Sequence, residues 1–537
     1  MVHPSSLIPI DRLKRWYNKG YIVPLIIPFN PKTKNPWELA KRFADQEANM
    51  FFLDSVRYQE KTGRYSYIGW NPFYIFQPHK LNGFVPELRG LFERYRGKKW
   101  DEAPFFTGGG VGYFSYEVGH AFEVLPSYAK DDLRFDPIAL LFVRNLIVFD
   151  HQSNTYFFVS NLFPREDGTF SEALEKERQL FCGFANKIST NPPPGRGSPP
   201  NIRQNTRRTR RAVWRELADP PICVAEKEVG VRNYVPPSRP SPARGEGVRI
   251  RNFRADISKS AFKKMVVRTK KYLEAGDIYQ ANLSQRFSFE FDREPATIYE
   301  SLRQINPSPF SSFLKLGEVT ILSSSPERLI RKSGDICETR PIAGTRPCGV
   351  TRAEEKNFRR DLMMSPKERA EHIMLVDLER NDLGRVCQPN SVHVSELMTI
   401  EKYSHVIHIV SNVKGKLRPE CDRFDLLKAV FPGGTITGCP KIRSMEIIEE
   451  LEPFKRHLYT GSIGYLAYDG DMDLNIVIRT IILKGKKGYI QVGAGIVYDS
   501  DPEAEYWETI HKGKAMVEAL GACKRNKLRK ILMTKSQ

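Results

Sequence analysis

The sequence lacks the long apolar segments of a membrane protein and the leader of a secreted one. Its longest apolar runs, residues 21–29 and 138–149, are too short to span a bilayer and are expected to form buried strands. The N-terminal stretch has no apolar core of the kind found in signal peptides. The eight cysteines form no CxxC pair and no short framework, which argues against a zinc site and against disulfides. These absences indicate a cytoplasmic protein with reduced thiols.

The common nucleotide-binding motifs are also missing. Two glycine-rich stretches, residues 432–438 and 493–495, match neither GxxxxGKS nor GxGxxG. Glycine allows backbone N–H groups to approach an anion closely, but it is equally common in tight turns. An anion site and a simple turn therefore both stay open for each stretch.

One segment has few acidic residues and accounts for nearly half of the net charge of +20. Residues 191–255 hold thirteen Arg and one Lys against five acidic residues. Their Pro, Gly and Ser content, without an apolar period, predicts a disordered insertion over residues 190–255. The run TRRTRRAVWR sets a Trp among arginines, as nucleic-acid stacking surfaces do, but no folded recognition module surrounds it. Nucleic-acid binding is therefore only a remote alternative.

The rest of the chain has the pattern of an α+β protein with large, mainly antiparallel sheets flanked by helices. Residues 21–160 are β-branched, aromatic and punctuated by glycine, which favours strands and tight turns, including a hairpin turned at residues 152–154. After residue 256, strands occur in groups with helices rather than in strict alternation. We expect a strand-rich N-terminal region (1–189), the insertion (190–255), a catalytic domain (256–520) and a basic C-terminal tail (521–537).

Two predicted helices each carry a pair of glutamates three residues apart. Ser365 stands at the expected N-cap of the first helix, with Glu368 in the capping-box position. Glu368 and Glu371 leave one face of this helix, and Glu505 and Glu508 repeat the spacing on a second helix. A single such pair is more often a solvated acidic face, but two together suit Mg2+, which binds few protein oxygens. The apolar face of the first helix is expected to comprise Ile373, Val376, Leu378 and Leu383.

Three further side chains are candidates for a charged site. Arg479 lies in the expected strand NIVIRT, where a charge is rarely left unpaired, and its planar fork suits a carboxylate. Lys512 could also pair with a carboxylate. His408, in HVIHIV, has the pattern of a satisfied core residue, although beside an anion site it could donate to a substrate oxygen. The residues alone thus point to an Mg2+-dependent enzyme for a small polyanionic carboxylate.

Many long motifs, in one order, resemble the chorismate-binding enzymes. These are the large synthase subunits of anthranilate synthase and aminodeoxychorismate synthase, with isochorismate and salicylate synthases as cousins. The resemblance covers roughly residues 256–520, the N-terminal strands resemble those of the same two synthases, and residues 190–255 match nothing in the family. The motifs are PERL, DIYQANLSQRF, ETRPIAGTRP, ERAEHIMLVDLERNDLGRV, YSHVIHIVSNV, FPGGTITGCPKIRSMEIIEELEP, YTGSIGYL and VGAGIVYDSDPEAEYWET.

The resemblance implies a metal site and a general acid. Glu371 and Glu508 would hold Mg2+, which grips the C1 carboxylate of chorismate, with Glu368 and Glu505 beside them through water or as further ligands. Glu327 of PERL would be the general acid that protonates the departing C4 hydroxyl, because hydroxide is a poor leaving group.

The resemblance also implies the contacts that hold the substrate. Tyr459, Arg479 and Gly493 would bind a substrate carboxylate, and Lys512 would support the metal end of the site. Ala343 belongs to the same substrate-binding set.

The resemblance further indicates the nucleophile. Thr345 and His408 would line the ring as catalytic residues together with Gln280. Cousins that add water at C2 have a basic lysine where this chain has Gln280, and an amide cannot deprotonate water. A nitrogen nucleophile is therefore indicated. No stretch offers a glutaminase cysteine in the expected glycine context, so ammonia should come from glutamine through a separate glutaminase subunit, or from solution.

Two reactions stay open for such an enzyme. Anthranilate synthases, of tryptophan biosynthesis, aminate C2 and release pyruvate, whereas aminodeoxychorismate synthases, which lead to p-aminobenzoate and folate, exchange the C4 hydroxyl for an amine. Ala343 stands where many of the latter carry a nucleophilic lysine, which favours C2 amination. The motifs FPGGTITGCPK and YTGSIGYL favour C4 amination, as does Leu53-Asp54-Ser55 where tryptophan-inhibited synthases show Leu-Glu-Ser. We expect C4 amination, giving 4-amino-4-deoxychorismate, with C2 amination as the alternative.

Overall fold

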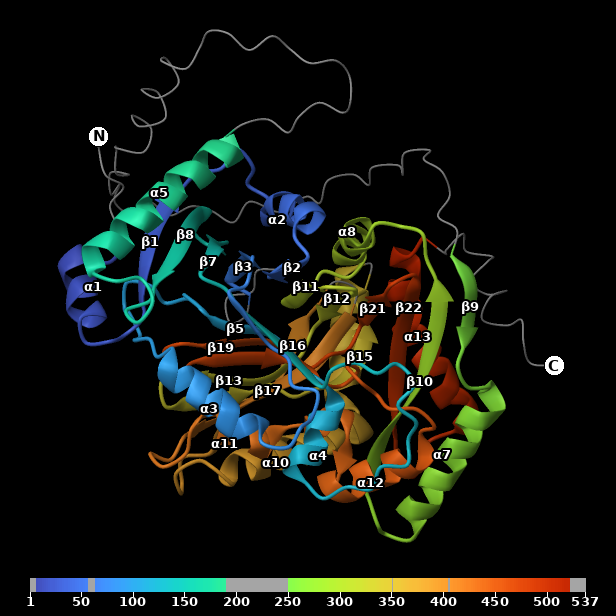
Figure 1. The fold of residues 1–537 in the computed structure, drawn as a ribbon. Coiled ribbons are helices and arrows are strands. Elements are labelled where there is room, and N and C mark those ends of the chain that lie inside the picture. Colours follow the sequence, from blue (N-terminus) through green and yellow to red (C-terminus); the bar gives the residue numbers. More distant parts are fainter. Residues whose placement is uncertain (1–5, 57–62, 190–249, 350, 404–405, 522–537) are drawn as a thin grey trace, which may run out of the picture.

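Two large β-sheets with helices packed against them make up the protein (Figure 1). The computed structural model describes residues 6–56, 63–189, 250–349, 351–403 and 406–521. One sheet has twelve strands and the other has ten, and the paired strands in both run antiparallel. This confirms the predicted α+β class with large antiparallel sheets.

The twelve-stranded sheet joins early and late parts of the chain. The junction is the pairing of β2 with β11, from Asp54 opposite Ser311 to Asn49 opposite Leu316. The strand order is β1 (Val23–Phe29), β8 (Thr155–Leu162), β7 (Asn145–Asp150), β3 (Tyr65–Trp70), β2 (Asn49–Asp54), β11 (Phe310–Leu316), β12 (Val319–Ser325), β21 (Thr480–Lys484), β22 (Lys487–Ile496), β10 (Gln280–Glu290) and β18 (Gly438–Cys439), with β9 (Arg251–Ala255) paired to β10.

The ten-stranded sheet is also shared between the two parts of the chain. Here β19 pairs with β5, so that Gly464 lies opposite Gly112. The strand order is β15 (Ile342–Pro347), β17 (Val406–Lys416), β14 (Ile336–Thr339), β13 (Arg328–Ser333), β20 (Met472–Asn475), β19 (Ser462–Ala467), β5 (Gly109–Phe114), β6 (Ile138–Phe142) and β4 (Tyr74–Phe76), with β16 (His393–Lys402) paired to β17. The described residues up to 189 and those from 250 onward therefore build both sheets together.

The helices divide between the two sheets. Helices α7, α8, α12 and α13 contact strands of the first sheet, and α9, α10 and α11 contact strands of the second. Their bounds are α1 (Ile10–Tyr17), α2 (Pro36–Gln46), α3 (Phe84–Arg94), α4 (Gly119–Phe122), α5 (Phe170–Ser189), α7 (Lys259–Glu274), α8 (Pro295–Ile305), α9 (Arg352–Met364), α10 (Pro366–Gly384), α11 (Arg423–Val430), α12 (Lys441–Leu451) and α13 (Pro502–Ala519), with short 3-10 turns η1 (Tyr116–Val118) and η2 (Gly434–Ile436).

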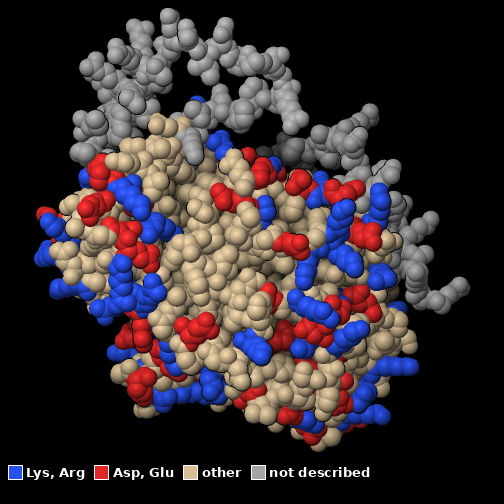
Figure 2. Space-filling model, in the orientation of Figure 1, with Lys and Arg blue, Asp and Glu red and all other residues tan. Residues whose placement is uncertain are grey.

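The surface carries charges of both signs. On the face shown in Figure 2, basic and acidic side chains are interspersed around a central area without charged groups. None of the described helices is both long enough and apolar enough to cross a membrane. The predicted disordered insertion falls almost entirely on residues 190–249, outside the described residues, so it stays a prediction there.

The boundary of that insertion was placed too late. Residues 251–255 form strand β9, which pairs with β10, instead of belonging to a disordered segment. Only Phe253 gives this strand an apolar side chain that packs, with ring centroids 5.5 Å from Phe287 and 6.0 Å from Phe289. The strand forms because it pairs with the edge of the longer strand β10. Its own residues are mostly exposed, so their sequence pattern does not predict a strand.

The apolar run at residues 138–149 forms two strands rather than one. Strand β6 belongs to the ten-stranded sheet and β7 to the twelve-stranded sheet, so the chain crosses from one sheet to the other at Val143 and Arg144. Arg144 forms an ion pair with Asp167 at 2.5 Å. Hydrophobicity alone cannot divide such a run, because both strands and the connection between them are largely buried.

Helix α10 has the predicted N-cap but a different buried face. The Ser365 hydroxyl accepts a hydrogen bond from the Glu368 N–H at 3.4 Å. Ile373, expected in the apolar face, is 47% exposed. The buried face instead includes the polar residues His372, Glu379 and Asp382, together with Val376, Leu378 and Leu383. Each of the three polar residues has a partner: Ser411, Thr339 and Lys441 respectively.

Candidate active site

The predicted site residues meet where α10 and α13 come together with strands of the first sheet. Gln280, at the start of β10, donates a side-chain hydrogen bond to Glu371 on α10 at 3.2 Å. Lys512, on α13, donates to the backbone carbonyl of Gly493 on β22 at 3.1 Å. Because α10 packs on the second sheet, these contacts bring the two layers together at one place.

The four helix glutamates, Glu368, Glu371, Glu505 and Glu508, influence one another electrostatically. Burial raises the pKa of Glu371, and the carboxylates of Glu368 and Glu508 raise it further. Burial also raises the pKa of Glu505, with a further contribution from Glu508. Carboxylates from two helices are therefore near enough to repel one another. Their partners are Arg346 at 2.9 Å for Glu368, Gln280 for Glu371, Ser500 at 2.6 Å for Glu505 and Lys512 at 2.7 Å for Glu508.

The donor set fits a hard divalent cation. All four groups are carboxylates, the ligand type that Mg2+ prefers, and the buried Oε2 of Glu505 accepts no hydrogen bond. Across the described ranges, however, no three acidic, His or Cys side chains already converge as a metal cluster. Residues that could hold a cation are thus present, and they are at present bound to other partners.

Glu327 is a buried carboxyl in the loop between β12 and β13. Its side chain is only 6% exposed, and its Oε1 is buried without a hydrogen-bond partner. Burial raises the pKa of Glu327 to about 7, although a contact from Thr435 and the charges of Arg479 and Lys512 oppose the shift. The next residue, Arg328, is fixed by a fork of two hydrogen bonds to Asp473 at 2.9 and 3.0 Å. This carboxyl can hold or release a proton near neutral pH.

Arg479 supplies positive charge beside Glu327, but not from a strand as predicted. Strand β20 ends at Asn475 and β21 begins at Thr480, so Arg479 lies in the connection. Its φ of +51° is in the left-handed region, where the chain turns before β21. Burial lowers the pKa of Arg479, while Tyr403 and Glu327 raise it. Apolar neighbours at residues 476–478 suggested a continuous strand, but this turn interrupts it.

His408 and Thr345 are brought together by the pairing of β17 with β15, which places them opposite each other. The Nδ1 atom of His408 lies 3.0 Å from the Gly344 carbonyl and 3.0 Å from the Thr345 hydroxyl. A carbonyl only accepts, so Nδ1 carries the proton. Burial lowers the pKa of His408 to about 4, and the neutral ring leaves its buried Nε2 as a free acceptor. The ring is thus suited to accept a hydrogen bond, whereas the sequence suggested a donor.

Gly344 and Ala343 shape the edge of β15 that faces α10. Gly344 has φ +60°, and a Cβ there would lie 2.9 Å from both the Glu368 carboxylate and Leu362. Only glycine combines this positive φ with the lack of space for a Cβ without strain. Ala343, buried beside it, lies opposite Ile409. The two small residues Ala343 and Gly344 therefore lie between Glu368 on one side and β17 on the other.

Tyr459 and Gly493 are in close contact. A Cβ on Gly493 would lie 2.6 Å from the Tyr459 hydroxyl and 2.7 Å from the Leu283 carbonyl, so no larger residue fits this strand position. Burial raises the pKa of Tyr459 to about 12, so the phenol stays protonated and can donate to an anion. Together with Arg479, it provides polar groups that could bind a carboxylate.

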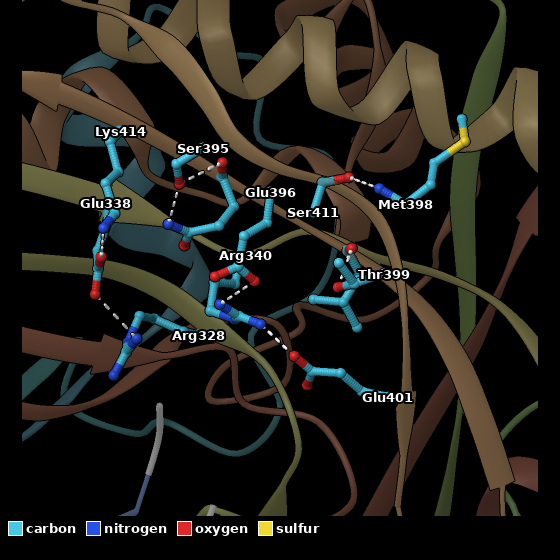
Figure 3. Close-up of polar contacts among 12 residues, drawn as sticks. Arg328, Glu338, Arg340, Ser395, Glu396, Met398, Thr399, Glu401, Ser411 and Lys414 are labelled. Carbon is cyan, nitrogen blue, oxygen red and sulfur yellow. Dashed lines mark hydrogen bonds and ion pairs between the residues drawn. The ribbon is translucent and has the colours of Figure 1, made fainter. Parts of the chain in front are cut away.

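Arg340, in the connection between β14 and β15, is bound to two glutamates of β16 (Figure 3). Arg340 forms ion pairs with Glu396 at 3.4 Å and with Glu401. Glu401 in turn accepts a hydrogen bond from the Tyr403 hydroxyl at 3.2 Å, and the Tyr403 ring meets His408 edge-on at 5.0 Å. This chain of contacts fixes the orientation of His408.

Comparison with known proteins identifies the family. Residues 53–518 match the family described as chorismate binding enzymes. The chain belongs to this family. The match covers most of the described residues, including all of the ten-stranded sheet and every predicted site residue, but it begins after β1.

Relatives of this chorismate binding enzyme carry two different names. The chain is 37% identical to an anthranilate synthase component 1 of Acetivibrio thermocellus, over 95% of this chain and 98% of that one. It is 40% identical to an aminodeoxychorismate synthase component 1 of Bacillus subtilis (strain 168), over 78% of each chain. The crystal structure of anthranilate synthase component I from Streptococcus pneumoniae TIGR4 superposes with a TM-score of 0.68 at 32% identity, covering 86% of this chain and 93% of that one. The relatives thus agree on the family and differ in the reaction.

Several side chains that support the site were not singled out from the sequence. Glu379 lies two helical turns beyond Glu371 on α10, and this spacing could have indicated that both face inward. Thr435 lies in the glycine loop that was recognised only as a turn or an anion site. Tyr403 gave no local signal, because its contact with His408 depends on the pairing of β16 with β17.

Proposed function

We propose that this chorismate binding enzyme aminates chorismate with ammonia. The observation that carries the proposal is the buried carboxyl of Glu327, whose pKa near 7 lets it hold a proton beside Arg479. Amination breaks the C4–oxygen bond, and a protonated carboxyl can deliver the proton with which that oxygen leaves as water. The nitrogen forms the new bond to the ring and then loses a proton, which balances the step.

Gln280 supports ammonia over water as the nucleophile. Its side-chain amide donates to Glu371 and has no nitrogen that could deprotonate water. Its buried Oε1 has no partner and would accept an N–H of the incoming ammonia. The residue therefore orients a nucleophile that needs no base.

We also propose that Glu371 and Glu508 hold Mg2+, with Glu368 and Glu505 beside them. The mutual repulsion of these carboxylates and the unpartnered oxygen of Glu505 support a cation there. When bound, Mg2+ would neutralise and orient the substrate carboxylate. Tyr459 and Arg479 would bind carboxylate oxygens, and Lys512 would stabilise the Glu508 end of the site.

The ring position that receives the nitrogen is proposed to be C4. The loop motif at residues 431–441, the motif at residues 459–466 and Asp54 in place of a glutamate support this reaction. Asp54 is buried, and it is occupied by an ion pair with Arg303 at 2.8 Å and a hydrogen bond from Tyr299 at 3.2 Å. The second candidate is C2 amination with loss of pyruvate. Ala343 supports it, since no lysine is available there to attack C2 covalently.

The ammonia is proposed to come from a separate glutaminase subunit. Both groups of relatives are named as a first component, which fits an enzyme that works with a second one. Ammonium salts at raised pH should replace that partner in a test of this chain alone.

The product decides between the two reactions. The purified chain is incubated with chorismate, Mg2+ and ammonium, and samples are followed by fluorescence and chromatography. C4 amination predicts an amino product that yields p-aminobenzoate only after an aminodeoxychorismate lyase is added. Direct appearance of anthranilate and pyruvate would establish the second candidate. Chorismate that is left unchanged, or that is converted only to a hydroxylated product, would contradict amination itself.

A further inference from the structure

A cleft of about 680 Å³ opens beside the ten-stranded sheet, and none of the residues assigned to the chorismate site lines it. Helices α3 and α11, the turn after β13 and the end of β17 form its walls. Strand β13 starts directly after Glu327 and carries Lys332 into the cleft. At the usual rise per strand residue, Arg328 and Lys332 are about 13 Å apart, so the cleft is not an extension of the chorismate site. Its volume falls within the range of small-molecule sites.

The lining of the cleft has more positive than negative groups. Six cationic side chains and three carboxylates line it. Three of the cations are compensated by acidic partners: Arg89 by Asp422 at 2.7 Å, Lys416 by Asp335 at 3.2 Å, and Arg418 by Glu420 at 3.3 Å. The other three are Arg96, Lys332 and Arg423. In the described part of the chain, no carboxylate oxygen lies within 4.0 Å of their charged groups.

Arg423 is the most buried of these uncompensated cations, with only 6% of its surface exposed. Its guanidinium lies 3.8 Å from the centre of the Phe92 ring and donates to the backbone carbonyl of Ala467. Burial lowers the pKa of Arg423 to about 10, and the more distant Asp469, Asp422 and Asp471 only partly oppose this. A charge in such surroundings is costly unless an anion accompanies it.

Lys332 brings a second uncompensated charge to the same cleft. Its ammonium group donates to the carbonyls of Gly334 at 2.7 Å and Gly470 at 3.1 Å, which leaves one N–H free. The nearby Asp471 is bound by Lys99 at 2.5 Å and is therefore engaged elsewhere. Backbone carbonyls thus hold the ammonium in place without neutralising it.

We propose that this cleft binds a small, multiply charged anion of the phosphate-ester or polycarboxylate class, with Arg423 and Lys332 as its principal contacts. Guanidinium groups already cover the rings of Phe92 and Phe424, so recognition rests on charge rather than on aromatic stacking. Arg96, at the exposed rim, adds a third positive charge. The proposal is independent of the reaction assigned to the chorismate site.

Calorimetric titration tests the proposal on the full chain. The probes are sodium pyrophosphate and sodium citrate, added separately with EDTA present and the ionic strength held constant. The variants are Lys332→Gln, which keeps a hydrogen-bond donor, and Arg423→Met. The matched control is Arg380→Gln, which removes one exposed positive charge on α10 outside the cleft. We expect saturable binding of at least one probe, weakened about tenfold or more in both cleft variants and unchanged in the control.

The outcomes separate the possible sources of binding. Pyrophosphate binding alone indicates a phosphate ester, and citrate binding alone indicates a polycarboxylate. The proposal is overturned if neither probe binds saturably, or if Lys332→Gln binds as tightly as the wild type. It is also overturned if Arg479→Gln abolishes binding while the cleft variants retain it, because the anion then occupies the chorismate site. Should Arg423→Met not fold, Lys332→Gln decides alone.

Discussion

Two groups of glutamates in and beside the candidate site differ in their surroundings. The first group consists of the four helix glutamates on α10 and α13, whose carboxylates lie near one another. Two of the buried glutamates, Glu327 and Glu379, form the second group and are 6% and 3% exposed. Burial raises their pKa values to about 7 and about 8 respectively. Carboxylates gathered at a helix surface favour a cation, whereas a carboxyl that is almost fully buried keeps a proton.

The comparison shows that position, rather than residue type, decides what a glutamate does. Helical spacing places the helix glutamates side by side, so each negative charge raises the pKa of its neighbours. The buried glutamates have protein around them in place of water, which disfavours the charged form. Glutamate side chains can therefore serve both as cation ligands and as a proton donor.

The largest effect is expected from the helix glutamates. Glu371→Gln and Glu508→Gln each remove a charged oxygen ligand with little change in shape. Turnover of chorismate with ammonium and Mg2+ should fall at least about 100-fold in either variant. The matched control is Glu503→Gln on α13, the helix that also carries Glu508. Glu503 pairs with Lys259 and Lys263, so this variant should keep near wild-type turnover. Wild-type activity that survives EDTA would contradict the metal assignment.

A smaller effect is expected where the protein only orients a site residue. Tyr403→Phe removes the hydroxyl that ties this ring to Glu401 and leaves the ring against His408. The loss of one hydrogen bond of about 1 kcal/mol corresponds to a roughly fivefold fall in kcat. Tyr498→Phe, an exposed tyrosine outside the site, serves as the control in the same steady-state assay. An unchanged kcat in Tyr403→Phe would show that this contact does not position His408.

Stability against pH should separate the buried group from the helix group. The folded-state pKa of Glu379 is about 8, above the ordinary carboxyl value of 4.5. Its contribution to stability is therefore fully present below pH 4.5 and is lost as the pH rises through about 8. Since this loss is spread between about pH 4.5 and about pH 8, the unfolding temperature of Glu379→Gln relative to that of the wild type should rise by about 1–3 °C between pH 6 and pH 9. Thermal unfolding of both proteins at the two pH values measures this, and equal differences at both would argue against a proton on Glu379.

The smallest effect is expected from the Arg-rich segment, which contains neither group of glutamates. Its composition predicts that removing residues 192–247 and joining the ends with a short Gly/Ser linker leaves activity within about twofold of wild type. Turnover with ammonium is compared for the two chains. Loss of folding in the shortened chain would mean that the segment packs against the body.

The sequence allowed much of this site to be predicted because its signals are local. The N-cap at Ser365 and the i, i+3 glutamate pairs follow from helix geometry, and long motifs identified the family. The pairing of Thr345 with His408 could not be predicted, since register between β15 and β17 depends on the whole sheet. Nor could the turn at Arg479, because it depends on elements far away in the chain.

The most direct test of the account is the pH dependence of kcat/KM for free ammonia, with chorismate and Mg2+ saturating. If Glu327 is the acid, only its protonated form works, so the wild-type value should fall about tenfold per pH unit above a pKa near 7. Glu327→Gln should be at least about 100-fold slower and should lack this descending limb. A wild-type value that stays level from about pH 6 to about pH 9, or a limb that persists in Glu327→Gln, would contradict the assignment of Glu327 as the proton donor.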